Sequence, residues 1–176
     1  LIKCIDVLKA QRPILGVCLG MQAIGQFFGA RLINLKQVFH GLARPVYITR
    51  PKDPLFTNCT NPFVAARYHS WGLDPESVRE PLAITAQDAE GRVMGIRHLQ
   101  HNICGLQFHP EVVHTPRGKE ILENFLFRVC GCRADWTMEP IGHVRDVRQI
   151  GGLILIDRRR VGRQVHRRSV VNRVNS

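Results

Sequence analysis

The chain has 176 residues, of which 44% are hydrophobic and 22% charged, a composition typical of one globular domain with a tail. It contains no apolar run of about 18 residues and no basic start followed by an apolar core, so neither a membrane span nor an export signal is expected. Of the net charge of +11, residues 143–176 carry +7, with nine arginines and two aspartates. The charge is not spread over a patterned face of the domain, so nucleic acid is not an expected partner.

The cysteines give no metal-binding or disulfide pattern. None of the six forms a CxxC pair, and no His/Cys cluster has zinc-ligand spacing, so no metal site is expected. In a reducing cytoplasm, the location that we expect, most of them should be small buried hydrophobic residues. A special role for any one of them must therefore come from its local setting.

The first part of the chain predicts an α/β unit. Residues 1–8 have apolar side chains at helical spacing, and Pro13 ends that helix. Residues 14–17 are typical of a short buried strand, and residues 21–30 have the pattern of an amphipathic helix. A strand, a tight turn and a helix in this order indicate an α/β fold.

The middle of the chain is rich in strands. Short apolar or β-branched runs, separated by turn sequences, predict strands at residues 46–49, 63–68, 82–86, 93–97 and 103–108. A helix is expected from Pro116 to about residue 130, with Thr115 as its N-cap. Beyond Trp136 the pattern decays, and residues 151–156 are compatible with one further strand.

The first candidate site is Gly16-Val17-Cys18-Leu19-Gly20, between the first strand and the following helix. Small residues on both sides of Cys18 allow the backbone to turn sharply and expose the thiol at the strand's end. The N-terminus of the helix favours a thiolate, and the amide of Leu19 is placed to stabilise an oxyanion. The alternative is a buried cysteine in a tight turn.

The second candidate site is His109-Pro110-Glu111, at the end of a later strand. In an extended chain, residues i and i+2 point the same way, so His109 and Glu111 can share a face. A carboxylate beside a histidine fixes the tautomer that the ring needs to accept a thiol proton. Together the two sites supply a nucleophile in Cys18, a general base in His109 and an orienting group in Glu111.

The sequences GVCLGMQ at 16–22 and GLQFHPE at 105–111 resemble those of the class I glutamine amidotransferases. The resemblance implies a three-layer α/β fold with an open, mostly parallel sheet and helices on both faces. It also implies hydrolysis of L-glutamine through a thioester on Cys18, with ammonia passed to a partner synthase and no cofactor. By the same match, the substrate is bound by Leu19, Gln22, Ser70 and Trp71.

Two subfamilies remain open. Residues 13–113, including RYHS at 67–70, are similar to the small subunits of anthranilate synthase and aminodeoxychorismate synthase, which aminate chorismate. Residues 105–139 instead resemble GMP synthetase. The first resemblance carries more weight because it surrounds the substrate. A third hypothesis is an inactive truncated domain or a basic nucleic-acid-binding module.

We expect the amidotransferase domain to span residues 1–135 and residues 136–176 to be an Arg-rich, irregular or non-native tail, similar to a sequence read in a shifted frame. Relatives normally have residues ahead of the position matching Leu1, with the first strands and a Gly-rich loop that completes the oxyanion hole. The sequence therefore predicts a domain that lacks its N-terminal strands.

Overall fold

The computed structural model describes residues 1–36, 38–133, 147–150 and 153–156. Within them, eight strands form one sheet in the order β4-β3-β6-β7-β8-β1-β10-β9. Their bounds are β1 Ile14–Val17, β3 Leu42–Ile48, β4 Phe63–Arg67, β6 Leu82–Gln87, β7 Val93–His98, β8 Ile103–Leu106, β9 Val147–Ile150 and β10 Leu153–Ile156. All five strands predicted from the middle of the chain are present.

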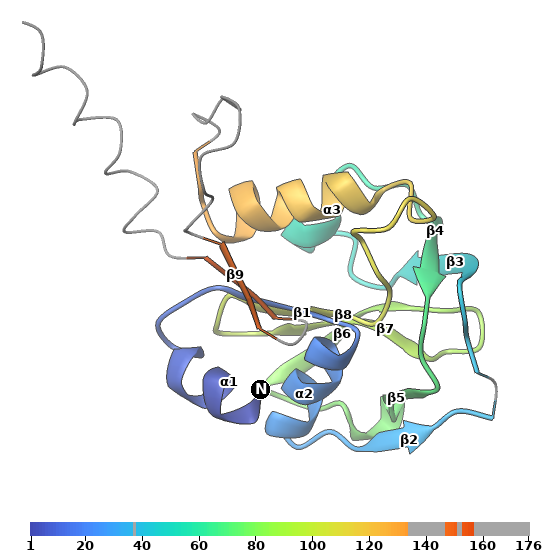
Figure 1. Cartoon of the computed structure of the whole chain (residues 1–176), viewed down its shortest axis with the longest axis horizontal. Helices are drawn as coiled ribbons and strands as arrows, with labels where there is room; N and C mark the ends of the chain where they lie inside the picture. The colour runs from blue at the N-terminus through green and yellow to red at the C-terminus, as the bar shows by residue number, and fades with distance from the viewer. Residues whose placement is uncertain (37, 134–146, 151–152, 157–176) are drawn as a thin grey trace, which may run out of the picture.

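Helices cover both faces of this sheet (Figure 1). The helices α1 (Ile2–Leu8) and α2 (Leu19–Phe27) lie on one face. The other face carries α3 (Gly118–Asn124), which continues as the π-helical turn η3 (Phe125–Val129), and the short 3-10 helix η1 (Pro54–Phe56). The predicted α/β fold with an open sheet between helical layers is therefore confirmed.

The strand directions differ from the expected mostly parallel sheet. Among the described strand pairs, β1–β8 is parallel, and the others are antiparallel. The reason is the length of the connections. Residues 88–92 join β6 to β7 and residues 99–102 join β7 to β8, whereas a parallel pair needs a crossover of a dozen or more residues.

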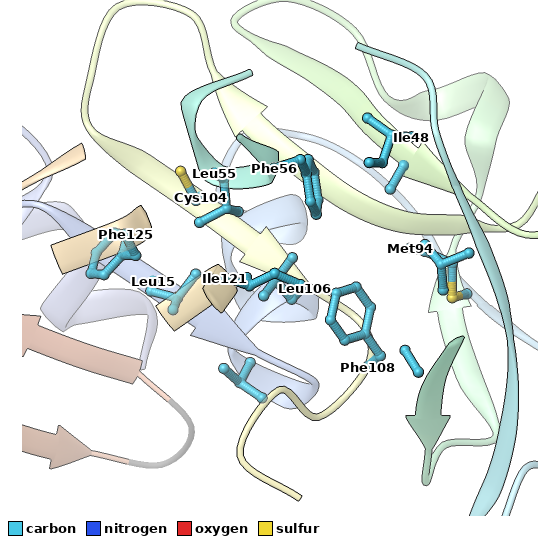
Figure 2. Close-up of a cluster of buried hydrophobic side chains, with 14 of the residues drawn as sticks. Leu15, Ile48, Leu55, Phe56, Met94, Cys104, Leu106, Phe108, Ile121 and Phe125 are labelled. Carbon is cyan, nitrogen blue, oxygen red and sulfur yellow. The ribbon is translucent and has the colours of Figure 1, made fainter. Parts of the chain in front are cut away.

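Two hydrophobic cores result from the alternation of side chains along the central strands. Leu15 of β1 packs into the same cluster as Ile121 and Phe125, on the α3 side of the sheet. Its neighbour Ile14 belongs to the opposite cluster, together with Met21 of α2. Figure 2 shows the first cluster, in which Leu106 and Phe108 lie among the side chains of α3 and η1. Since β1 contributes to both cores, its position in the sheet is strongly fixed.

A second, two-stranded sheet was not predicted from the sequence. It pairs β2 (Leu32–Asn34) with β5 (Trp71–Leu73) in antiparallel fashion. Each strand has only three residues, which is too short for a recognisable alternation of apolar and polar side chains. This small sheet lies beside α2 (Figure 1) and holds Trp71 in place.

Part of the predicted tail is ordered into strands. β10 pairs antiparallel with β1 and with β9. β10 falls within residues 151–156, where the sequence allowed a further strand, whereas β9 was not expected. The predicted domain boundary at residue 135 and the remainder of the tail lie outside the described residues. In the described part of the chain, no helix has the length and apolar character to cross a membrane.

Candidate active site

Cys18 lies at a sharp turn between the carboxyl end of β1 and the N-terminus of α2. Its φ is 51°, a left-handed conformation that is uncommon for a residue with a side chain. The backbone N–H of Cys18 donates to the carbonyl of Leu106 at 2.7 Å, which continues the β1–β8 ladder by one residue. The thiol is partly exposed at the position expected for the nucleophile.

Gly16 makes this turn possible because α2 packs directly against β1. A Cβ atom at Gly16 would lie 2.5 Å from the backbone carbon of Gly20 and 2.6 Å from a methyl group of Ile24. Any larger residue at 16 would push α2 away from the strand. The glycine at position 16 is therefore explained by the close approach of α2 to β1, in addition to the sharp turn that the sequence suggested.

His109 and Glu111 lie beside Cys18, as predicted. Nδ1 of His109 is 2.6 Å from a carboxylate oxygen of Glu111, so this nitrogen carries a proton and donates. Nε2 of His109 is buried and forms no well-aligned hydrogen bond within the described residues. The Cys18 thiol nevertheless lies close to the ring and is the main cause that raises the pKa of His109 to about 9. Glu111 also raises this pKa, whereas burial lowers it. The ring is thus protonated at neutral pH.

The backbone around His109 is clamped from two sides. The Thr115 hydroxyl donates to the carbonyl of His109 at 2.7 Å and accepts from the amide of Ala66 at 3.0 Å. Thr115 is therefore not the helix cap that the sequence suggested, since α3 begins at Gly118 after Arg117 with no side-chain cap. A Cβ atom at Gly118 would lie 1.8 Å from the carbonyl oxygen of Pro110. The helix start thus packs directly on the His-Pro-Glu turn.

The predicted glutamine-binding residues lie on α2 and on the segment next to it. Gln22 is buried, and its Nε2 donates to the carbonyl of Trp71 at 2.9 Å, which joins α2 to the segment of Ser70 and Trp71. Leu19, the first residue of α2, is exposed, and so is the side chain of Trp71. The first amides of a helix have no acceptor within it, so the N–H of Leu19 is available to an oxyanion.

Sequence reasoning gave no role to two further residues. The Tyr68 ring packs edge-on against His109, with ring centroids 5.3 Å apart. Gln107 is fully buried, and its Nε2 lies 3.7 Å from Sγ of Cys18. Gln107 precedes His109 by two positions at the end of a strand, so the i, i+2 rule that pairs His109 with Glu111 already places it on the same side. In the described residues, no group of three or more His, Cys, Asp or Glu side chains could hold a metal ion.

Comparisons with known proteins agree on one family. Residues 1–129 match the model of the family described as glutamine amidotransferase class-I. The chain is 45% identical over 120 residues to aminodeoxychorismate synthase component 2 of Klebsiella aerogenes, which covers 68% of this chain and 63% of that protein. It is 42% identical over 137 residues to anthranilate synthase component 2 of Pseudomonas aeruginosa, which covers 74% of this chain and 67% of that protein.

Solved structures share the fold. A protein of Thermoplasma acidophilum, assigned to GMP synthase as one of its subunits, superposes with a TM-score of 0.66 at 29% identity, over 74% of this chain and 62% of that one. A glutamine amidotransferase of Thermotoga maritima gives a TM-score of 0.60 at 18% identity, over 73% of this chain and 66% of that one. The chain thus spans about two thirds of the length of these proteins and of the two curated relatives named above.

The first prediction concerns the proton on His109. A nuclear magnetic resonance titration of the ring should give a midpoint at about 9 rather than at the ordinary value of 6.5. Cys18→Ala removes the largest cause of the shift and Glu111→Gln another, so each should lower the midpoint. A midpoint near the ordinary value in the unaltered chain would contradict the placement of the thiol beside the ring.

The second prediction tests the packing of α3 on the His-Pro-Glu turn. Helix propensity alone favours Gly118→Ala by about 1 kcal/mol, whereas the clash with Pro110 predicts a lower melting temperature. Gly72→Ala is the matched control, because its Cβ would have its nearest neighbour at an ordinary 3.7 Å. Thermal unfolding by circular dichroism distinguishes the two; a Gly118→Ala chain that melts higher than the unaltered one would refute the steric argument.

Proposed function

Since this chain belongs to the class-I glutamine amidotransferase family, we propose that it hydrolyses the side-chain amide of L-glutamine at Cys18. The ammonia then passes to a synthase partner that aminates chorismate. The observation that carries the proposal is the contact of His109 with both Cys18 and Glu111 at the carboxyl end of β1. The chain covers less than two thirds of the length of some relatives. The activity, the substrate and the partner of the whole protein are therefore part of this proposal.

The first half of the reaction follows from the protonation of His109. With a pKa of about 9, the ring holds a proton at neutral pH, so the thiol proton can reside on the imidazolium. The Cys18 thiolate attacks the amide carbon of glutamine, and the developing oxyanion accepts from the N–H of Leu19. His109 then donates its proton to the leaving nitrogen. Ammonia departs, and a γ-glutamyl thioester remains on Cys18.

The second half returns the enzyme to its starting state. His109, now neutral, removes a proton from a water molecule that attacks the thioester carbon. Glutamate leaves, and the proton on the ring again pairs with the thiolate. Throughout, Glu111 accepts from Nδ1–H at 2.6 Å, which fixes the ring and stabilises its charged form. Ser70, Trp71 and Gln22 supply the glutamine pocket in this proposal.

Chorismate amination is favoured as the destination of the ammonia. Curated relatives at 45% and 42% identity are component 2 subunits of aminodeoxychorismate and anthranilate synthases. GMP synthase is represented here by a structural neighbour at 29% identity, and residues 134–139 of the GMP synthetase-like segment lie outside the described residues. We propose a cytoplasmic location, which the six free cysteines support because reducing compartments preserve thiols.

The third prediction tests glutamine recognition directly. A diazo-ketone analogue of glutamine should add once to the chain, as seen by intact mass, because the positioned Cys18 thiolate displaces its leaving group. The adduct should disappear in Cys18→Ala and be suppressed by excess glutamine. Cys59→Ala is the control, since burial raises the pKa of that thiol to about 11. Absence of an adduct, or labelling spread over several cysteines, would favour the inactive-domain hypothesis.

The fourth prediction tests the acceptor. The chain is mixed with the chorismate-binding subunit of an anthranilate or aminodeoxychorismate synthase, or with the synthetase domain of a GMP synthetase. Glutamine-dependent amination is expected with the chorismate-binding protein and not with the synthetase domain. Ammonium salt in place of glutamine shows that each acceptor is competent. Glutamine-dependent formation of GMP would instead overturn the assignment to chorismate.

A further inference from the structure

We propose that Gln107 is a further catalytic residue, whose side-chain N–H stabilises the Cys18 thiolate while His109 acts as the proton donor. Nε2 of Gln107 lies 3.7 Å from Sγ of Cys18, within reach of a large sulfur acceptor. The inference rests on the proposed role of Cys18 as the nucleophile. An N–H donor in contact with the reacting sulfur stabilises the thiolate before it attacks. It stabilises the thiolate again when the sulfur leaves from the thioester.

The orientation of the Gln107 amide is determined by the hydrogen bonds around it. The carbonyl of Trp71 can only accept, so Gln22 must present its NH₂ group to it, at 2.9 Å. The same NH₂ group has its second hydrogen directed to Oε1 of Gln107 at 3.2 Å. With its oxygen thus engaged, Gln107 must direct its own NH₂ group to Cys18. Each hydrogen bond in this series therefore has a defined donor and acceptor, and the NH₂ group of Gln107 is the donor to the sulfur of Cys18.

Burial makes this donor effective. Gln107 has no exposed surface, and Gln22 is 7% exposed, so water cannot replace either amide. Hydrogen bonds to a charged acceptor are stronger than neutral ones and gain further from a low local dielectric. The two amides therefore form a fixed support for negative charge on Cys18, alongside the charged ring of His109.

The chain of amides also connects the nucleophile to the glutamine pocket. The Trp71 carbonyl accepts from Gln22 and also from Nδ1–H of His69 at 2.9 Å. Burial lowers the pKa of His69, so its ring is neutral, and the bond at Nδ1 sets its tautomer. A continuous series of hydrogen bonds thus joins the Ser70–Trp71 segment, through Gln22 and Gln107, to the sulfur.

The test measures alkylation of Cys18 by iodoacetamide, a small neutral probe that needs neither glutamine nor a synthase partner. At pH 7, Gln107→Leu should be alkylated about tenfold more slowly than the unaltered chain, because a donor to a charged group is lost. Gln26→Leu, an exposed glutamine on α2, should match the unaltered chain. The difference in alkylation rate between Gln107→Leu and the unaltered chain should shrink at alkaline pH, where a thiol ionises even without a stabilising donor.

A merely structural role predicts something different. Loss of access to Cys18 would slow alkylation at every pH, and general loosening would speed labelling of Cys4 on α1. Either pattern would overturn the proposal, as would an unchanged rate at pH 7 in folded Gln107→Leu. If that variant fails to fold, Gln107→Glu keeps the size of the side chain but presents a carboxylate. It should be slower still at pH 7, and a normal rate would count against a donor at this position.

This experiment separates the inference from the proposed function. If the chain is not a glutaminase, the diazo-ketone adduct is absent in the unaltered chain whatever the state of Gln107. If the glutaminase assignment is right and Gln107 has no catalytic role, glutamine still protects Cys18 from the diazo-ketone. The iodoacetamide rate of Gln107→Leu then equals that of the unaltered chain.

Discussion

The parallel pairing of β1 with β8 is the constraint on which the site depends. Its register places Val17 opposite Leu106, so the next residues, Cys18 and Gln107, leave the sheet side by side. A hydrogen bond of 2.7 Å from the amide of Cys18 to the Leu106 carbonyl extends the ladder to Cys18 itself. One residue of slippage would direct these side chains to the opposite face, and both cores oppose such a shift.

The site combines a strained backbone with a rigid surround. The left-handed conformation of Cys18 has an energetic cost, and such strain persists only where the neighbouring structure over-determines it. Here α2 packs against Gly16 with no room for a Cβ, and α3 packs still more closely on Pro110 through Gly118. The two glycines bring helices from opposite faces of the sheet against the turns that carry Cys18 and His109. The geometry of Cys18 and His109 is thus fixed from both sides.

Neighbouring groups at the site shift the pKa values of its two histidines in opposite directions. Cys18 and Glu111 both raise the pKa of His109, whereas burial is the main cause that lowers the pKa of His69, with a smaller contribution from His109. The neighbouring histidines thus have opposite protonation states, one charged against the thiol and one neutral against a backbone carbonyl. This division suits the proposed reaction, in which one histidine, His109, carries each transferred proton. Gln107 and Gln22 add support for the anion without adding a group that titrates.

The sequence by itself determined the helices, the principal strands and the residues of the two turns, because apolar periodicity, glycine spacing and i, i+2 alternation act over short stretches of chain. It did not determine the strand directions, the small sheet that holds Trp71, or the bonds of Gln107 and Thr115. Those depend on contacts between residues far apart in the chain, such as Gln22 with Gln107 and Ala66 with Thr115. A glutamine or threonine has the same local sequence pattern whether it faces solvent or the Cys18 thiol, so only tertiary packing decides what it contacts.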